Sequence, residues 1–148
     1  MLDKTDEEIV SQLVQNCRGS YRKMAKKLRM HPTTLISRIE KLEKSGVIEG
    51  YGAKLNLGKL GYEFMGIVQI KITKGQLLET QKKLSRLRGV VAVYDITGEY
   101  DSTAILAAKT REEFSQLIKS LLQLPHIEHT NTQVILNTVK ESWQFEAV

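Results

Sequence analysis

The chain has 148 residues, of which 41% are hydrophobic and 26% charged, a composition typical of a globular protein with a buried core. Its single cysteine, Cys17, excludes an intramolecular disulfide and a cysteine-rich metal site. No segment approaches the roughly 20 apolar residues of a membrane span, and the charged first residues lack the apolar region of a signal peptide. We therefore expect a cytoplasmic protein with no membrane partner.

The formal net charge of +5 is concentrated in the first half of the chain. Residues 1–64 contain 12 Lys/Arg and 8 Asp/Glu (+4), whereas residues 65–148 contain 10 and 9 (+1). Between Arg18 and Lys41, eight basic residues accompany one acid, Glu40. This segment is a candidate polyanion-binding surface, although a solvated basic face would be the simpler interpretation without structural context.

The first predicted helix begins near Thr5. The Thr-Asp-Glu-Glu run that starts there fits a capping box, in which the hydroxyl accepts from an amide of the first turn and the glutamate reaches back to the cap. Ile9 and Leu13 then recur at helical spacing as an apolar stripe. The helix is expected to end near Gly19.

A second predicted helix follows Ser20, which can cap it. One face is apolar, with Met24, Ala25 and Leu28, and the opposite face is basic. Lysine and arginine side chains at such a place can anchor DNA phosphates. The basic face consists of Arg22, Lys23, Lys26 and Lys27.

The third predicted helix begins at Pro32, because proline suits the first helical position. Leu35, Ile39 and Leu42 form its buried stripe, and Gly46 can take the left-handed conformation that ends it. Two short helices joined by a three-to-four-residue turn form a helix-turn-helix.

The opposite face of this third helix carries hydroxyl and basic side chains, which can hydrogen-bond base edges near the N-terminus of a recognition helix. These residues are Thr33, Thr34, Ser37, Arg38 and Lys41, preceded by His31. Geometry and charge together predict binding of double-stranded DNA.

Residues 47–51 are rich in β-forming side chains and predict a short strand or wing, and several glycines follow. We expect a helix-turn-helix DNA-binding domain over residues 1–50, a linker or short strand over 51–63, and an oligomerisation and effector-binding domain over 64–148.

The second half alternates strand and helix patterns. Thr110 and Glu113 fit a capping box for the second helix of this half, in which Phe114, Leu117, Ile118, Leu121 and Leu122 form the strongest apolar stripe in the chain. Strands are predicted over 64–73, 90–97, 102–108 and 127–139, and helices over 76–87 and from 110 to Pro125. The order is βαββαβ, the ferredoxin-like motif, so the predicted fold class is α+β.

Two of these strands are apolar on both faces. Ile67 alternates with Val68, and Val91 and Val93 alternate with Tyr94. Helices cover one face of a ferredoxin-like sheet, so the other face would expose an apolar patch, and such patches usually mark association surfaces. We expect at least a homodimer.

Taken together, these motifs resemble those of the Lrp/AsnC (feast/famine) family of regulators, from about Asp3 to about Lys140. The motifs that carry the resemblance are the capped first helix, His31-Pro32, Arg38-Ile39, Leu42-Glu43, Gly46-Val47-Ile48, Tyr51 and the Gly98-Glu99-Tyr100-Asp101 turn within βαββαβ. The resemblance does not cover the tail from Ser142.

The resemblance implies a transcriptional regulator that forms homodimers through its second domain, often assembled into tetramers or octamers, with an amino acid as effector. By position, the effector would contact Gly98, Glu99, Tyr100, Asp101, Thr130 and Thr132. His31 stands where the family usually has serine, and Glu99 stands where aspartate is common.

Two other classes of function compete with this one. No serine elbow, HExxH, P-loop or GxGxxG motif is present, so neither catalysis nor a cofactor is expected, although some tetrapyrrole decarboxylases have a similar two-domain architecture. An effector-binding oligomer without DNA binding is a third class, which the basic second helix and Arg38 argue against. His126 and His129 have the spacing of metal ligands, but an interface or surface role is the simpler interpretation.

Overall fold

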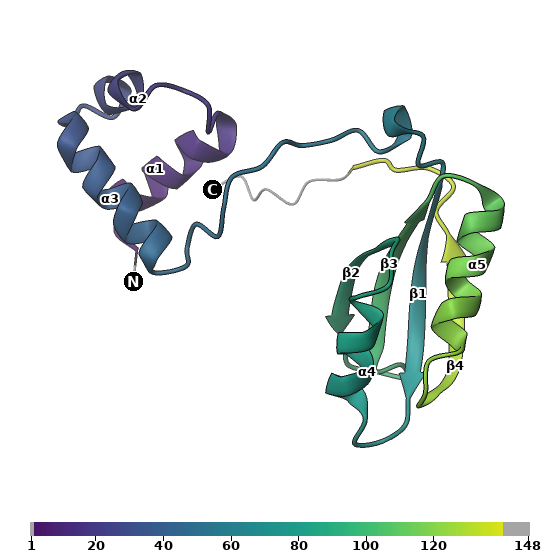
Figure 1. The fold of residues 1–148 in the computed structure, drawn as a ribbon. Helices are drawn as coiled ribbons and strands as arrows, with labels where there is room; N and C mark the ends of the chain where they lie inside the picture. The colour runs from purple at the N-terminus through teal and green to yellow at the C-terminus, as the bar shows by residue number, and fades with distance from the viewer. Residues whose placement is uncertain (1, 141–148) are drawn as a thin grey trace. The chain divides into compact units, whose positions relative to one another are not determined.

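A computed structural model describes residues 2–140 and divides them into two compact units (Figure 1). One unit extends to Lys54 and the other comprises Leu55–Val139. The predicted tail from Ser142 lies outside the described residues.

The first unit consists of three helices around one apolar cluster. They are α1 (Lys4–Gln15), α2 (Tyr21–Lys27) and α3 (Pro32–Lys44). Ile9 from α1, Ala25 from α2 and Leu35 from α3 are fully buried in this cluster. Ile39 and Leu42 are buried beside them, which confirms the predicted inward stripe of the third helix and turns its polar side chains outward.

The predicted cap of α1 was wrong by two residues. Asp3, not Thr5, is the N-cap: its carboxylate accepts from the amide of Asp6 at 2.8 Å, and the Asp6 carboxylate accepts from the amide of Asp3 at 3.4 Å. A carboxylate can serve both the N-cap and the N3 position of a capping box. With Asp3 as the N-cap, the helix begins at the next residue, Lys4. The helix also ends earlier than predicted, at Gln15.

The predicted strand over residues 47–51 is absent, because the chain stays folded against the end of α3. Gly46 takes the left-handed conformation with φ 75°, as its place after the helix predicts. The amides of Val47 and Ile48 then both donate to the carbonyl of Leu42, at 3.0 and 3.2 Å. These donors are therefore unavailable for a strand.

The second unit is a four-stranded antiparallel sheet with two helices, which confirms the ferredoxin-like prediction (Figure 1). The strands lie in the order β2-β3-β1-β4. A 3₁₀ turn, η1 (Gly58–Leu60), precedes them. The elements are β1 (Phe64–Ile72), α4 (Leu77–Leu84), β2 (Val90–Asp95), β3 (Ser102–Ala108), α5 (Arg111–Leu122) and β4 (Ile127–Val134).

Helices α4 and α5 cover one face of the sheet. Val68 and Ile70 of β1 are fully buried there with Leu84 of α4 and Leu121 of α5. Thr110 caps α5 by accepting from the amide of Glu113 at 3.1 Å, as predicted. The alternation of β1 therefore leaves Ile67 and its neighbours on the face that the helices do not cover.

Three boundaries and one burial prediction in this unit were wrong. The last strand ends at Val134 and not at residue 139, and Val134 is the register partner of Gly66 near the start of β1. Helix α4 stops at Leu84 instead of continuing to residue 87, and β2 stops at Asp95 instead of residue 97. Leu122 is 48% exposed, since it lies one helical step beyond the buried Leu121.

Candidate nucleic-acid interface and effector-binding turn

The outer face of α3 presents polar side chains to solvent. Thr33, Thr34, Ser37 and Lys41 are exposed and, with Asp3 and Arg38, line a shallow hollow beside the start of α1. Leu35 and Ile39 hold this face outward from within the core. The face therefore has the hydrogen-bonding groups and the exposure that contact with base edges in a groove requires.

The guanidinium of Arg38 is held within the unit by two carboxylates. Its Nη1 lies 2.7 Å from Oδ2 of Asp3 and 2.6 Å from Oδ1 of Asp6. The Asp6 side chain is only 12% exposed, so this contact takes place partly inside the protein. The hydrogen bond from Arg38 is also the main reason why the pKa of Asp3 lies below its ordinary value. Arg38 thus ties α3 to the start of α1.

His31 precedes α3 but does not cap it with its side chain. Its ring Nδ1 lies 2.8 Å from Oγ1 of Thr33, so the imidazole and this hydroxyl form one polar group at the N-terminal end of the helix. The imidazole therefore does not act as a side-chain cap of α3.

The basic side chains predicted on α2 point to solvent. Met24 and Ala25 are buried, whereas the side chains on the opposite face are exposed. Among residues 2–140, none of the four basic side chains of α2 is within 4.0 Å of a carboxylate, so their charge is available to an external polyanion. The four are Arg22, Lys23, Lys26 and Lys27.

Sequence reasoning missed Ile36. This side chain is 40% exposed on α3, one step along the helix from the fully buried Leu35. It lies outside the stripe of Leu35, Ile39 and Leu42, and helical periodicity alone could have singled it out as an apolar residue on the outer face.

The turn over residues 98–101 is fastened to the end of β1. The carboxylate of Asp101 accepts from the amide of Ile72 at 2.9 Å and from Nζ of Lys71 at 3.2 Å. The bond from Ile72 is the main reason why the pKa of Asp101 is lowered. Gly98 has φ 121°, a conformation that favours glycine. Asp101 is therefore already engaged within the chain, while Gly98 and Glu99 are exposed.

Three of the six predicted effector residues can be placed relative to the sheet. The ring of Tyr100 packs edge-on against His129, with 5.5 Å between ring centroids. Thr130 and Thr132 pair in register with Ile70 and Val68, so their side chains belong to the helix-covered face. His129, which precedes Thr130 on β4, belongs to the opposite face. Within one chain, Tyr100 and the two threonines are therefore on different sides of the sheet.

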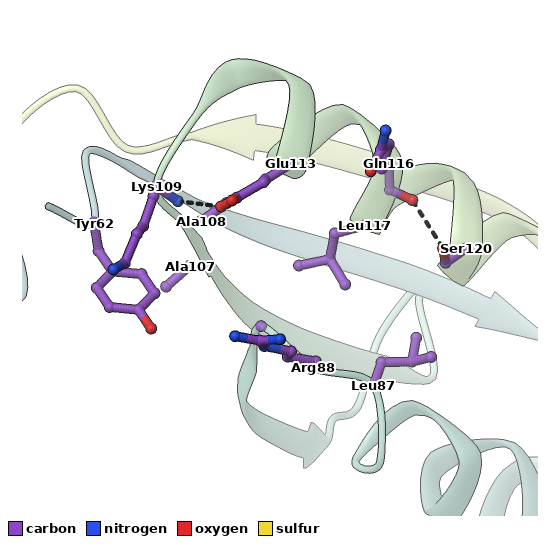
Figure 2. Close-up of a pocket in the computed structure, with 11 residues that line it drawn as sticks. Tyr62, Leu87, Arg88, Ala107, Ala108, Lys109, Glu113, Gln116, Leu117 and Ser120 are labelled. Carbon is purple, nitrogen blue, oxygen red and sulfur yellow. Dashed lines mark hydrogen bonds between the residues drawn. The ribbon is translucent and has the colours of Figure 1, made fainter.

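A groove of about 530 Å³ lies between α5, the segment that leads into β2 and the end of β3 (Figure 2). Figure 2 shows Leu87 and Leu117 on its walls and Arg88 between them and Tyr62. The ammonium of Lys109 lies 5.4 Å from the centre of the Tyr62 ring, a cation-π contact. The groove combines apolar walls with two cationic side chains, and sequence reasoning did not identify it.

In the part of the chain that the structure covers, no group of three or more His, Cys, Asp or Glu side chains is placed to hold a metal ion. No described helix is long and apolar enough to cross a membrane.

Family comparisons cover both halves of the chain. The sequence model of the AsnC-type helix-turn-helix domain matches residues 2–43, and that of the Lrp/AsnC ligand binding domain matches residues 65–145. An uncharacterized HTH-type transcriptional regulator of Pyrococcus furiosus is 42% identical over 145 residues, covering 98% of each chain.

Solved structures share the whole fold. AsnC of E. coli superposes with a TM-score of 0.89 at 24% identity, covering 96% of this chain and 97% of its own. A transcriptional regulator of Neisseria meningitidis, solved in complex with L-Met, gives a TM-score of 0.88 at 20% identity, covering 98% and 96%. At these identities the likeness establishes the fold.

Proposed function

The chain belongs to the Lrp/AsnC family of transcriptional regulators, and we propose that an amino acid effector controls its binding to specific DNA sites through α3. Its first unit is an AsnC-type helix-turn-helix domain and its second a ligand-binding domain. The observation that carries the proposal is the outer face of α3, where Thr33, Thr34 and Ser37 are exposed above a buried apolar stripe.

Two kinds of contact would hold the DNA. The exposed hydroxyls of α3 are suited to base edges in the major groove, and the exposed cations of α2 are suited to phosphates. Phosphate contacts carry no sequence information, so they would position the duplex while α3 reads it. Arg38 would contribute by holding α3 in place, because its guanidinium is engaged by Asp3 and Asp6.

We also propose that the open face of the sheet joins two copies of the chain. Ile67 and Ile105 are register partners on this face, and Tyr94 is 41% exposed on the same side. A homodimer would present two copies of α3 to successive major grooves, about 10 bp apart. Dimers would then assemble further, as tetramers or octamers.

The effector is proposed to be an amino acid that binds where dimers meet. The related regulator of Neisseria meningitidis was solved with L-Met, which supports an amino acid ligand. Contacts are expected at the exposed turn with Gly98 and Glu99 and at Tyr100, Asp101, Thr130 and Thr132. Because Tyr100 lies on the opposite side of the sheet from Thr130 and Thr132, a neighbouring copy would have to complete the site. Effector binding would shift the assembly and so change which DNA arrays fit.

The other classes of function find less support. The P. furiosus relative is named a transcriptional regulator and not an enzyme, which favours regulation over tetrapyrrole chemistry. Four exposed cations on α2 favour a polyanion partner over an effector-binding oligomer without DNA binding. If the purified protein bound no DNA duplex at low salt concentration, that result would support an effector-binding oligomer without DNA binding.

Selection of random duplexes followed by gel shifts tests the proposal. We expect the purified protein to enrich a two-fold symmetric site, and at least one of the twenty amino acids to raise its melting temperature and change its affinity for that site. Failure to enrich any sequence would overturn the DNA-binding half. Equal DNA affinity and equal oligomer size with every amino acid would overturn the effector half.

A further inference from the structure

Ile36 is an apolar side chain on an otherwise polar face. It is 40% exposed, whereas the other apolar residues of α3 are buried: Leu35 at 0%, Ile39 at 2% and Leu42 at 3%. Its neighbours one helical turn away are Thr33 and Glu40, both exposed. An isoleucine here adds nothing to the buried cluster of the unit.

The rest of the outer face offers few of the side chains that identify guanine and adenine most strongly. Those are arginine or lysine for guanine, and asparagine or glutamine for adenine, through paired hydrogen bonds. Helix α3 contains neither asparagine nor glutamine. Its one arginine, Arg38, has Nη1 of its guanidinium engaged by Asp3 and Asp6 at 2.7 and 2.6 Å. Hydroxyls, Lys41 and Ile36 are therefore the exposed side chains on this face that can contribute to sequence discrimination.

Thymine is the base that an aliphatic side chain can identify. Its 5-methyl group projects into the major groove, and cytosine has hydrogen at the same position. We propose that Ile36 is a specificity-determining residue that packs against the methyl group of a thymine in each half-site. This inference rests on the proposed function, because it requires α3 to lie in the major groove.

The size of the effect follows from the methyl group itself. Burial of one such group changes the binding constant about fourfold, the equivalent of about 0.8 kcal/mol. A symmetric site has two half-sites, so removal of both methyl groups should weaken binding about 15-fold if the contacts add.

Replacement of thymine by deoxyuridine in the selected site tests the proposal, because it removes the 5-methyl group and keeps the base pair. Each thymine is replaced in turn, symmetrically in both half-sites, and the affinity of the wild-type protein is measured by gel shift. We expect one position at which deoxyuridine weakens binding about 15-fold. Ile36→Ala should bind the thymine site more weakly and should bind the thymine and deoxyuridine sites equally.

Val47→Ala is the matched control, since Val47 is also an exposed aliphatic residue of the first unit, at 44%, but lies beyond α3. It should keep the wild-type loss on deoxyuridine replacement, and far-UV circular dichroism should show that both variants fold. The inference is overturned if no replacement weakens the wild-type protein, or if Ile36→Ala keeps the full loss. Either result leaves DNA binding intact, whereas failure to select any site refutes the proposed function itself.

Discussion

The guanidinium of Arg38 on α3 lies 2.6 Å from the carboxylate of Asp6 on α1, across 32 residues of sequence. Asp6 is also the residue whose side chain closes the capping box with Asp3. One ionic cluster therefore starts α1 and fixes the position of α3. Arg38, which sequence analysis predicted to contact DNA, also supports in the structure the helix that carries the other candidates.

Arg38→Ala is expected to destabilise the first unit. It leaves the Asp6 carboxylate, whose side chain is 12% exposed, without its cationic partner, and an unsatisfied buried group of this kind costs about 1 to 3 kcal/mol. Thermal or urea denaturation measures this loss. Lys44→Ala removes an exposed charge from the same helix and should change stability little. Equal stability of the two variants would contradict the assigned role.

Asp6→Asn distinguishes positioning from direct base contact. If Arg38 acts by holding α3, the loss of the Asp6 charge should weaken specific DNA binding, as Arg38→Ala does. If Arg38 itself contacts DNA, the same substitution leaves the guanidinium with Asp3 as its remaining carboxylate partner, makes it easier to release, and should strengthen binding. We expect the weaker binding, measured by gel shift against a selected and a scrambled duplex in parallel.

The architecture of the first unit was predictable because its buried stripes are local. Ile9, Leu35 and Ile39 recur at helical spacing, so their burial follows from periodicity. The ion pair between Arg38 and Asp6 was not predictable in this way, since it joins two helices whose relative placement is a tertiary property. Helical spacing shows that Arg38 is outside the buried stripe of α3. It does not show that Asp3 and Asp6 at the start of α1 lie beside it.

The same contrast applies to the second unit. Alternation in β1 and the Thr110 cap of α5 identified the strands and helices, because each signal is local. The register between strands was not visible in the sequence. It places Thr130 on the helix-covered face and the contact between Tyr100 and His129 on the other, so it divides the candidate effector residues.

Acid should weaken the anchor of the effector turn. The pKa of Asp101 is lowered from 3.8 in the folded protein, chiefly by the amide of Ile72, so its contribution to stability is present above about pH 3.8 and is lost as pH falls through the lowered value. At pH 6 the melting temperature of the wild type should be higher than that of Asp101→Asn, and the difference between the two melting temperatures should shrink below pH 3.8. Asp95→Asn is a control on the neighbouring strand. A difference that is constant with pH would refute the linkage.

Lys26→Ala should weaken specific and non-specific DNA binding alike. Each phosphate contact that is lost lowers the slope of log affinity against log salt by about 1. Binding is titrated at several salt concentrations against the selected and a scrambled duplex. Lys82→Ala, an exposed lysine on α4 in the other unit, should leave the slope unchanged. A loss confined to the selected duplex would move Lys26 into the base-reading group.

The central claim is that the outer face of α3 lies in the major groove, and tethered cleavage tests it directly. Ser37→Cys is made in a Cys17→Ser background, because Cys17 is exposed and would also react, and iron-EDTA is attached to the new thiol. Ser115→Cys on α5, also exposed, serves as the control position. We expect the Ser37 probe to cut the selected duplex at two clusters about 10 bp apart, and the Ser115 probe to leave those positions uncut. Binding of the labelled Ser37 protein without cleavage, or equal cleavage from both probes, would contradict the account.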